Sequence, residues 1–241
     1  MQALDPEAMH HLAVKLIDLA YAPAGAAEML AIQPDSETKE LCLSATAKYV
    51  PLIKEEAVSL RELSRVAMAR QGDMSYWKLS AFDLADMVRK LTVSYSDRAK
   101  AKGVSLETVL GEVPQAFGDE SAINRLVSNL IVYPLGVIPE HGKLRIELEK
   151  AGTNIRLTVT DSSHSLSLDD LKHFFDPFYY RPHFTRAGAD SCGLLLALVK
   201  EVAEAHKGSV RAEPADQEGV RVVVELPSVL RKGEFTDSPS H

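Results

Sequence analysis

Apolar residues recur at helical spacing through the first third of the chain. Residues 6 to 32 are rich in Ala, Leu and Met and predict one helix. Asp35 or Ser36 can cap a second helix that runs to about residue 71. Its apolar stripe includes Val50, Ile53, Ala57, Leu60 and Leu63. Pro51 falls inside this stripe and predicts a bend.

After a break over residues 71–80, the pattern changes to shorter helices. One is expected from Leu84 to Tyr95, and another opens at Gly118-Asp119, with Pro134 as its expected end. Residues 169–175 predict a short helix. A further helix is marked by Leu195, Leu198, Val199, Val202 and His206, and Gly208 can terminate it.

Alternation with period two predicts the strands of the second part. Residues 143–149 and 154–160 look like a pair of neighbouring strands, and residues 209–213 and 220–226 give two more. Strands interleaved with helices indicate a two-layer α/β sandwich. The polar tail after residue 228 is expected to pack little.

The two N-terminal helices cannot bury both of their faces against each other. Helical hairpins of this kind usually dimerise into a four-helix bundle, which makes a second copy of the chain an expected partner. The alternative is that the hairpin packs on its own C-terminal domain.

Composition narrows the classes of function. The chain has 241 residues, 46% hydrophobic and 25% charged, with a net charge of −7, which disfavours nucleic acid and anionic membrane as partners. No apolar run reaches the roughly 20 residues that span a bilayer, and the first residues do not resemble a signal peptide. Cys42 and Cys192 suggest neither a disulfide framework nor a metal site. A cytoplasmic location is expected.

The order of motifs resembles the dimerisation and ATPase domains of bacterial sensor histidine kinases. Residues 157–180 resemble that family's strand, nucleotide loop and F box, the last with Phe175 and Phe178. Residues 193–210 resemble its glycine-rich helix start, and residues 118–130 resemble its N box helix. The resemblance implies a dimerisation hairpin over residues 1–75, an ATPase-like domain over residues 78–228 and a flexible tail over residues 229–241. It also implies response-regulator receiver domains as partners.

The resemblance places Asp18 where the family carries its phosphoryl-accepting histidine, because the matching stretch is DLAYAP. Neutral imidazole accepts a phosphoryl group near pH 7, whereas a carboxylate acceptor normally needs Mg²⁺ and a cation beside it. His10 and His11 are possible substitute acceptors, and a solvated position near a helix start is the simpler interpretation of both.

The metal-binding Asn of the N box falls on Tyr133 when the flanking motifs are aligned without gaps, and Asn129 then takes the first Asn position. A phenol is a poor ligand for Mg²⁺, which prefers carboxylate, carbonyl and water oxygens. A second alignment, which needs a deletion and an insertion, makes Asn129 the metal ligand.

Both glycine-rich loops of the family are altered. The first carries Asp161, which in the family accepts a hydrogen bond from the adenine amino group, but Ser163 and Ser165 replace the two glycines. In the second loop only Gly193 remains, and Leu195 stands where the last glycine would be. Leu195 would fill phosphate space if it faced the loop, or it completes the apolar face of its helix.

Changes at the acceptor, the metal position and both loops favour a pseudokinase scaffold that docks receiver domains, with no cofactor expected. A histidine phosphotransferase of a phosphorelay is the second hypothesis, and it needs His10 or His11. The third is a divergent kinase that binds Mg-ATP through Asn129, Asp161 and Gly193. The upstream signal and the specific regulator do not follow from the sequence.

Overall fold

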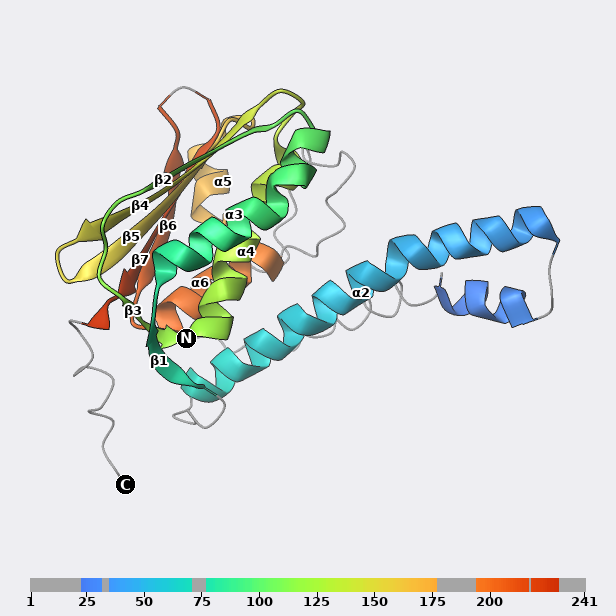
Figure 1. The fold of residues 1–241 in the computed structure, drawn as a ribbon, viewed down its shortest axis with the longest axis horizontal. Helices are drawn as coiled ribbons and strands as arrows, with labels where there is room; N and C mark the ends of the chain where they lie inside the picture. The colour runs from blue at the N-terminus through green and yellow to red at the C-terminus, as the bar shows by residue number, and fades with distance from the viewer. Residues whose placement is uncertain (1–22, 32–34, 71–76, 177–193, 217, 230–241) are drawn as a thin grey trace.

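The computed structural model describes residues 23–31, 35–70, 77–176, 194–216 and 218–229. Its main feature is a five-stranded mixed sheet in the order β2-β4-β5-β7-β6 (Figure 1). The strands are β2 (Ser105–Leu110), β4 (Lys143–Ala151), β5 (Asn154–Asp161), β7 (Val220–Pro227) and β6 (Ser209–Pro214). β2 runs parallel to β4, and the other neighbouring pairs are antiparallel. The predicted strands over residues 143–160 and 209–226 are confirmed.

Three helices cover one face of this sheet: α3 (Leu84–Ala101), α4 (Glu120–Val137) and α6 (Leu194–Ala205). They enclose a core to which β4 contributes Leu144 and Ile146 through the alternation of its side chains. The short α5 (Leu168–Lys172) follows β5 and is capped by Ser167. The predicted two-layer α/β sandwich is therefore confirmed.

A second sheet has two strands and includes the first strand of the domain. β1 (Leu79–Phe82) pairs in antiparallel fashion with β3 (Ala116–Asp119). Both strands have only four residues, which is too short for a recognisable alternation of side chains. Asp119 ends β3 and caps α4, because its carboxylate accepts the backbone N–H of Ala122 at 2.9 Å.

The long helix α2 (Ser36–Arg70) precedes the domain. It starts after Asp35, whose carboxylate accepts the N–H of Thr38 at 2.8 Å, and it continues through Pro51. Residues 23–31 form a helical segment beside its first turns. Part of α2 lies against α6 within the same chain, whereas its first turns and residues 23–31 project away from the domain (Figure 1). Dimerisation as a four-helix bundle stays a prediction.

Two helix ends differ from prediction. α4 contains Pro134 and continues for three more residues to Val137, where the backbone N–H of Ile138 donates to the Pro134 carbonyl at 2.8 Å. The ammonium of Lys102 donates to the Leu135 carbonyl at 2.7 Å and so caps the last turn. After α6, Lys207 rather than Gly208 adopts the left-handed conformation, with φ 58°.

The open face of the sheet carries paired charges of opposite sign. Arg156 on β5 donates to Glu149 of β4 at 3.0 Å and to Glu225 of β7 at 2.8 Å, and these hydrogen bonds raise the pKa of its guanidinium. Arg145 on β4 similarly binds Glu107 of β2 and Glu147. Side chains on this face are therefore tied across neighbouring strands. Among the described helices, none is long and apolar enough to cross a membrane.

Candidate functional site

The predicted nucleotide loop begins at the end of β5, the central strand of the sheet, which lies between β4 and β7. Asp161 is its last residue and is buried. One carboxylate oxygen accepts the backbone N–H of Ser163 at 2.7 Å. Ser163 is itself buried, whereas Ser165 is exposed. The carboxylate of Asp161, which the family resemblance assigns to the adenine amino group, therefore accepts a backbone hydrogen bond from its own loop.

The loop is also fastened to the start of β4. The Ser162 hydroxyl accepts the backbone N–H of Lys143 at 2.7 Å, and the Ser162 N–H donates to the Lys143 carbonyl at 3.0 Å. A Cβ at Gly142 would lie 2.8 Å from the Ser162 hydroxyl oxygen and 2.3 Å from the side chain of Ile138. Sequence analysis missed this role of Ser162, which makes the loop a tightly held turn.

Asn129 connects the N box helix to the second loop. It lies on α4 with 1% of its surface exposed, and its amide nitrogen donates to the Leu195 carbonyl at 3.1 Å. Leu195 is half-buried in the first turn of α6. A bond between residues 66 positions apart therefore brings together two residues predicted for the site. Gly193 lies outside the described residues.

Tyr133, one turn further along α4, faces aromatic side chains. Its ring meets Phe174 edge to face, with ring centroids 5.8 Å apart, and Phe174 meets Phe175 in the same manner at 5.1 Å. Phe175 was predicted as part of the F box, whereas Phe174 was missed. The paired Phe174-Phe175 sequence was the available signal. The residue that the gap-free alignment places at the family's metal position is thus part of an aromatic cluster.

The gap-free alignment puts a residue at the family's metal position that does not suit a magnesium ion. The ring of Tyr133 packs on Phe174, and the Asn129 amide donates to a backbone carbonyl. Within the described ranges, no group of three His, Cys, Asp or Glu side chains is placed to hold a metal. In the gap-free alignment the protein thus offers a packed phenol where the family offers an amide oxygen, and Mg²⁺ prefers carboxylate, carbonyl and water oxygens.

Comparison with known proteins bears on this arrangement. Residues 118–230 match the family described as histidine kinase-, DNA gyrase B- and HSP90-like ATPase. The chain contains a histidine kinase core. Signal transduction histidine-protein kinase BaeS of Escherichia coli K12 is 28% identical over 69% of this chain and 35% of the relative. Sensor histidine kinase ZraS of Escherichia coli O157:H7 is 24% identical over 90% of this chain and 48% of the relative. The chain spans about a third to a half of the length of these histidine kinases.

Solved structures of histidine kinases share the fold. A solved chain of the Acinetobacter baumannii histidine kinase AdeS superposes with a TM-score of 0.65 at 19% identity, over 91% of this chain and 98% of the solved chain. Histidine kinase ThkA, solved in complex with response regulator protein TrrA, gives a TM-score of 0.63 at 20% identity. The superposition with ThkA covers 95% of this chain and 63% of the ThkA chain.

The contacts of the predicted site residues divide them into three groups. Asn129 joins Leu195, Tyr133 joins the F box, and Asp161 joins Ser163. Ser165 stands apart on the exposed part of its loop. The acceptor position Asp18 and the substitute acceptors His10 and His11 lie outside the described residues, so their interpretation stays a prediction.

Proposed function

We propose that this histidine kinase core is a catalytically degraded scaffold, a pseudokinase of a two-component pathway that docks response-regulator receiver domains. The packing of Tyr133 on Phe174 carries the proposal, because in the gap-free alignment Tyr133 takes the family's metal position and its ring is held in an aromatic contact. Phosphoryl transfer relies on Mg²⁺ to neutralise charge on the phosphates, so the loss of this ligand removes a requirement of the reaction.

The two loops support the same proposal. Ser163 and Ser165 replace glycines that would let backbone N–H groups approach phosphate without a Cβ. The N–H of Ser163 already donates to Asp161, and the Asn129 amide already donates to Leu195. A phosphate that bound the Ser163 N–H would have to break the bond from that N–H to Asp161.

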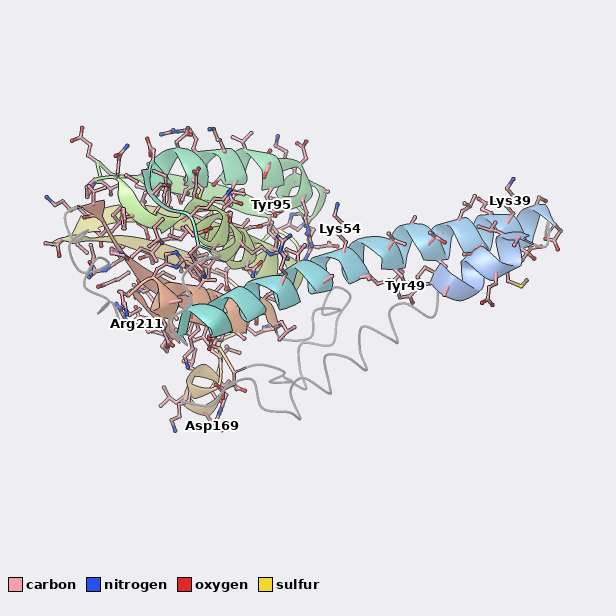
Figure 2. All side chains as sticks on the ribbon, turned by 90° about the horizontal axis from the view of Figure 1, so that it is seen from below. Lys39, Tyr49, Lys54, Tyr95, Asp169 and Arg211 are labelled. Atoms are coloured by element: carbon pink, nitrogen blue, oxygen red, sulfur yellow. The ribbon has the colours of Figure 1, made fainter. Side chains whose placement is uncertain are left out.

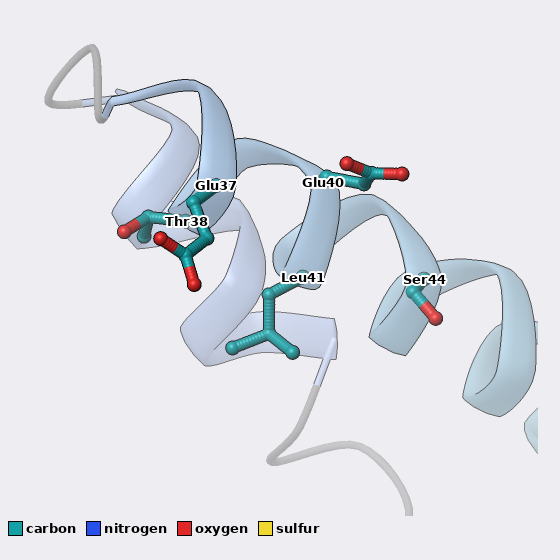
Figure 3. Close-up of a pocket in the computed structure, with 5 residues that line it drawn as sticks. All are labelled: Glu37, Thr38, Glu40, Leu41 and Ser44. Carbon is teal, nitrogen blue, oxygen red and sulfur yellow. The ribbon is translucent and has the colours of Figure 1, made fainter.

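The family resemblance gives the first helix of the hairpin as the receiver-docking surface, and we propose that docking extends onto the adjoining first part of α2. Leu41, Leu43 and Val50 there are 72%, 52% and 47% exposed. Figure 2 shows Lys39 and Tyr49 on the part of α2 that projects beyond the domain. A shallow hollow on the same turns is lined by Glu37, Thr38, Glu40, Leu41 and Ser44 (Figure 3). Apolar surface rimmed by polar groups is typical of protein contacts.

Thermal melting with and without millimolar Mg-ATP tests the loss of nucleotide binding. A ligand at 100 times its dissociation constant adds about 2.7 kcal/mol to the folded state, which raises the melting midpoint by several degrees. We expect no rise. The matched control is a variant that restores family residues, Tyr133→Asn with Ser163→Gly, Ser165→Gly and Leu195→Gly. A clear rise with the natural chain would contradict the proposal and favour the divergent kinase.

Receiver docking needs a separate test. Binding to a panel of purified receiver domains should occur, and Leu41→Asp with Leu43→Asp should weaken it, because both side chains are exposed in the single chain. Sedimentation of the variant shows whether a dimer is retained. Failure of the whole panel would contradict docking. Acid-labile phosphate that moves from a phosphorylated receiver to His10 or His11 would instead favour the histidine phosphotransferase.

A further inference from the structure

One edge of the main sheet carries hydrogen-bonding groups that meet no partner among the described residues. The edge strands are β6 and β2, and α5 lies against β6. Within the described chain, β2 pairs only with β4, in an unbroken parallel register from Ser105 to Leu110. Natural edge strands are usually protected by lysine, proline or a bulge, and β2 contains none of these. The edge formed by β2 is therefore open to a further strand.

Hydrogen bonds on the β4 side show which backbone groups of β2 face outward. The N–H groups of Ser105 and Gly111 donate to carbonyls on that side, at 2.9 Å and 2.8 Å. Backbone groups of successive residues in a strand point to opposite sides, so those of Leu106, Thr108 and Leu110 face away from β4. No hydrogen bond from a described residue reaches these outward groups. Their N–H and C=O groups are thus available to a neighbouring strand.

Apolar side chains along the same edge remain partly uncovered. Leu106 and Leu110 are half-buried on the helix-covered face, and Val109 is 42% exposed on the open face. The charged residue of β2, Glu107, binds Arg145 of β4 at 3.1 Å. A strand added here would bury leucine surface without burying an unpaired charge of β2.

The chain that leaves β7 heads back toward this edge. Ser228 bridges Ala116 in antiparallel fashion, and the N–H of Val229 donates to the Gln115 carbonyl at 2.9 Å. Residues 111–115 connect β2 to β3. A chain that keeps an antiparallel course beside this connection reaches the end of β2 and then runs along its outward edge. The contact at Val229 therefore directs the following residues toward β2.

The sequence after β7 fits one register on the edge of β2. A one-residue bulge at Pro114, which has no N–H to donate, places the tail residues Gly233, Phe235 and Asp237 opposite the three outward residues of β2. Each of these tail residues has an N–H. The opposite bulge, with the extra residue in the tail, would set Pro239 against an outward carbonyl and lose a hydrogen bond.

The side chains of the tail agree with this register. Phe235 would lie on the helix-covered face between the two half-buried leucines. Arg231 would lie opposite Glu112, which is exposed. Thr236 would lie opposite Glu107, so no like charges face each other. The apolar and charged positions of the tail therefore match those of the β2 edge.

We infer that residues 230–238 form a sixth strand of the main sheet, antiparallel to β2, which closes the open edge. The polarity of this segment predicts little packing, whereas the direction of the chain at Val229 and the outward groups of β2 favour a paired strand. The added strand would bury Leu106 and Leu110 and keep β2 from pairing with another copy of the chain. The inference goes beyond receiver docking and does not depend on it.

Amide hydrogen exchange in the full chain tests the pairing. The outward N–H groups of Leu106, Thr108 and Leu110 should exchange about tenfold more slowly in the natural chain than in a chain that stops at Val229. The alternate N–H groups of β2, which bond on the β4 side, are the internal control and should exchange at the same rate in both chains. Outward amides that exchange at the rate of open amides in the natural chain, or equally slowly in both chains, would overturn the inference.

A substitution at the centre of the edge gives a second reading. Thr108→Pro removes one outward N–H without removing a bond to β4, and Thr108→Val is its matched control. Trypsin should cleave after Arg231 and Lys232 about tenfold faster in Thr108→Pro than in Thr108→Val, because the released segment is accessible. The fluorescence of Trp77, whose ring centroid lies 4.3 Å from that of His206, checks that the domain stays folded. Equal cleavage rates in both variants and the natural chain would reject the added strand.

Discussion

Two glycines with positive φ offer a matched test of how the end of β5 is held. Gly219 has φ +107°, and a Cβ there would lie 2.0 Å from the Asp161 carbonyl oxygen. Gly152 has φ +63°, and a Cβ there would meet nothing within 4 Å. Gly219→Ala therefore combines backbone strain with a clash between strands, whereas Gly152→Ala introduces the strain alone.

The expected losses of unfolding free energy follow from these contacts. Strain at positive φ costs an L-residue about 1–2 kcal/mol, partly offset by a less flexible unfolded chain, so Gly152→Ala should lower the unfolding free energy by about 1 kcal/mol. Real Cβ atoms essentially never approach within 3.0 Å, so Gly219→Ala must push β7 and β5 apart by about 1 Å. The lost ladder bond and poorer packing bring its cost to about 3–4 kcal/mol.

Urea denaturation followed by circular dichroism measures both variants against the natural chain. For a chain of this length each kcal/mol corresponds to about 2–4 °C of melting midpoint, so thermal melting should give the same ranking. The amide resonance of Ser163 should shift in Gly219→Ala but not in Gly152→Ala, because its partner Asp161 is displaced. Equal destabilisation by the two substitutions would refute the reasoning.

Two further predictions concern surface charges. Arg156→Met should lower the unfolding free energy by about 1 kcal/mol in low salt and by less in high salt, because the partly exposed guanidinium bridges β4 and β7. Arg145→Met is the control. The Arg145 guanidinium binds Glu147 of its own strand β4 and Glu107 of the edge strand β2. An equal loss of unfolding free energy in both variants would count against the bridging argument. The hydrogen bond from Lys90 lowers the pKa of Asp86, so this pair stabilises the fold above the ordinary carboxyl pKa, and the contribution disappears as pH falls through the lowered value. Titration of the Asp86 carboxyl by NMR should show that pKa rising in Lys90→Met, and no change would contradict the assignment.

Much of the fold could be predicted because its main elements carry long, regular patterns. β4 alternates over its first seven residues and β5 over all eight, and α6 has a continuous apolar face. β1 and β3 are too short for such a pattern. The continuation of α4 past Pro134 depends on Lys102, which is distant in sequence, so the proline alone suggested an earlier end.

The candidate site was predictable residue by residue but not as a set of contacts. The motifs identified Asn129, Tyr133 and Asp161, whereas the partner of each depends on how α4, α6 and β5 pack. Sequence analysis treated His206 only as one position of a helical stripe. Its bond to Asp119 joins residues 87 positions apart, and no local pattern encodes that separation.

The single tryptophan of this chain stacks on His206 where the long helix enters the domain. Its fluorescence therefore reports on one small region rather than on the whole fold. Backbone circular dichroism averages over every helix and strand. If the two signals change at different denaturant concentrations, the junction opens before the sandwich unfolds, and a single unfolding free energy no longer describes the molecule. The chain thus carries its own optical probe of the connection between its two parts.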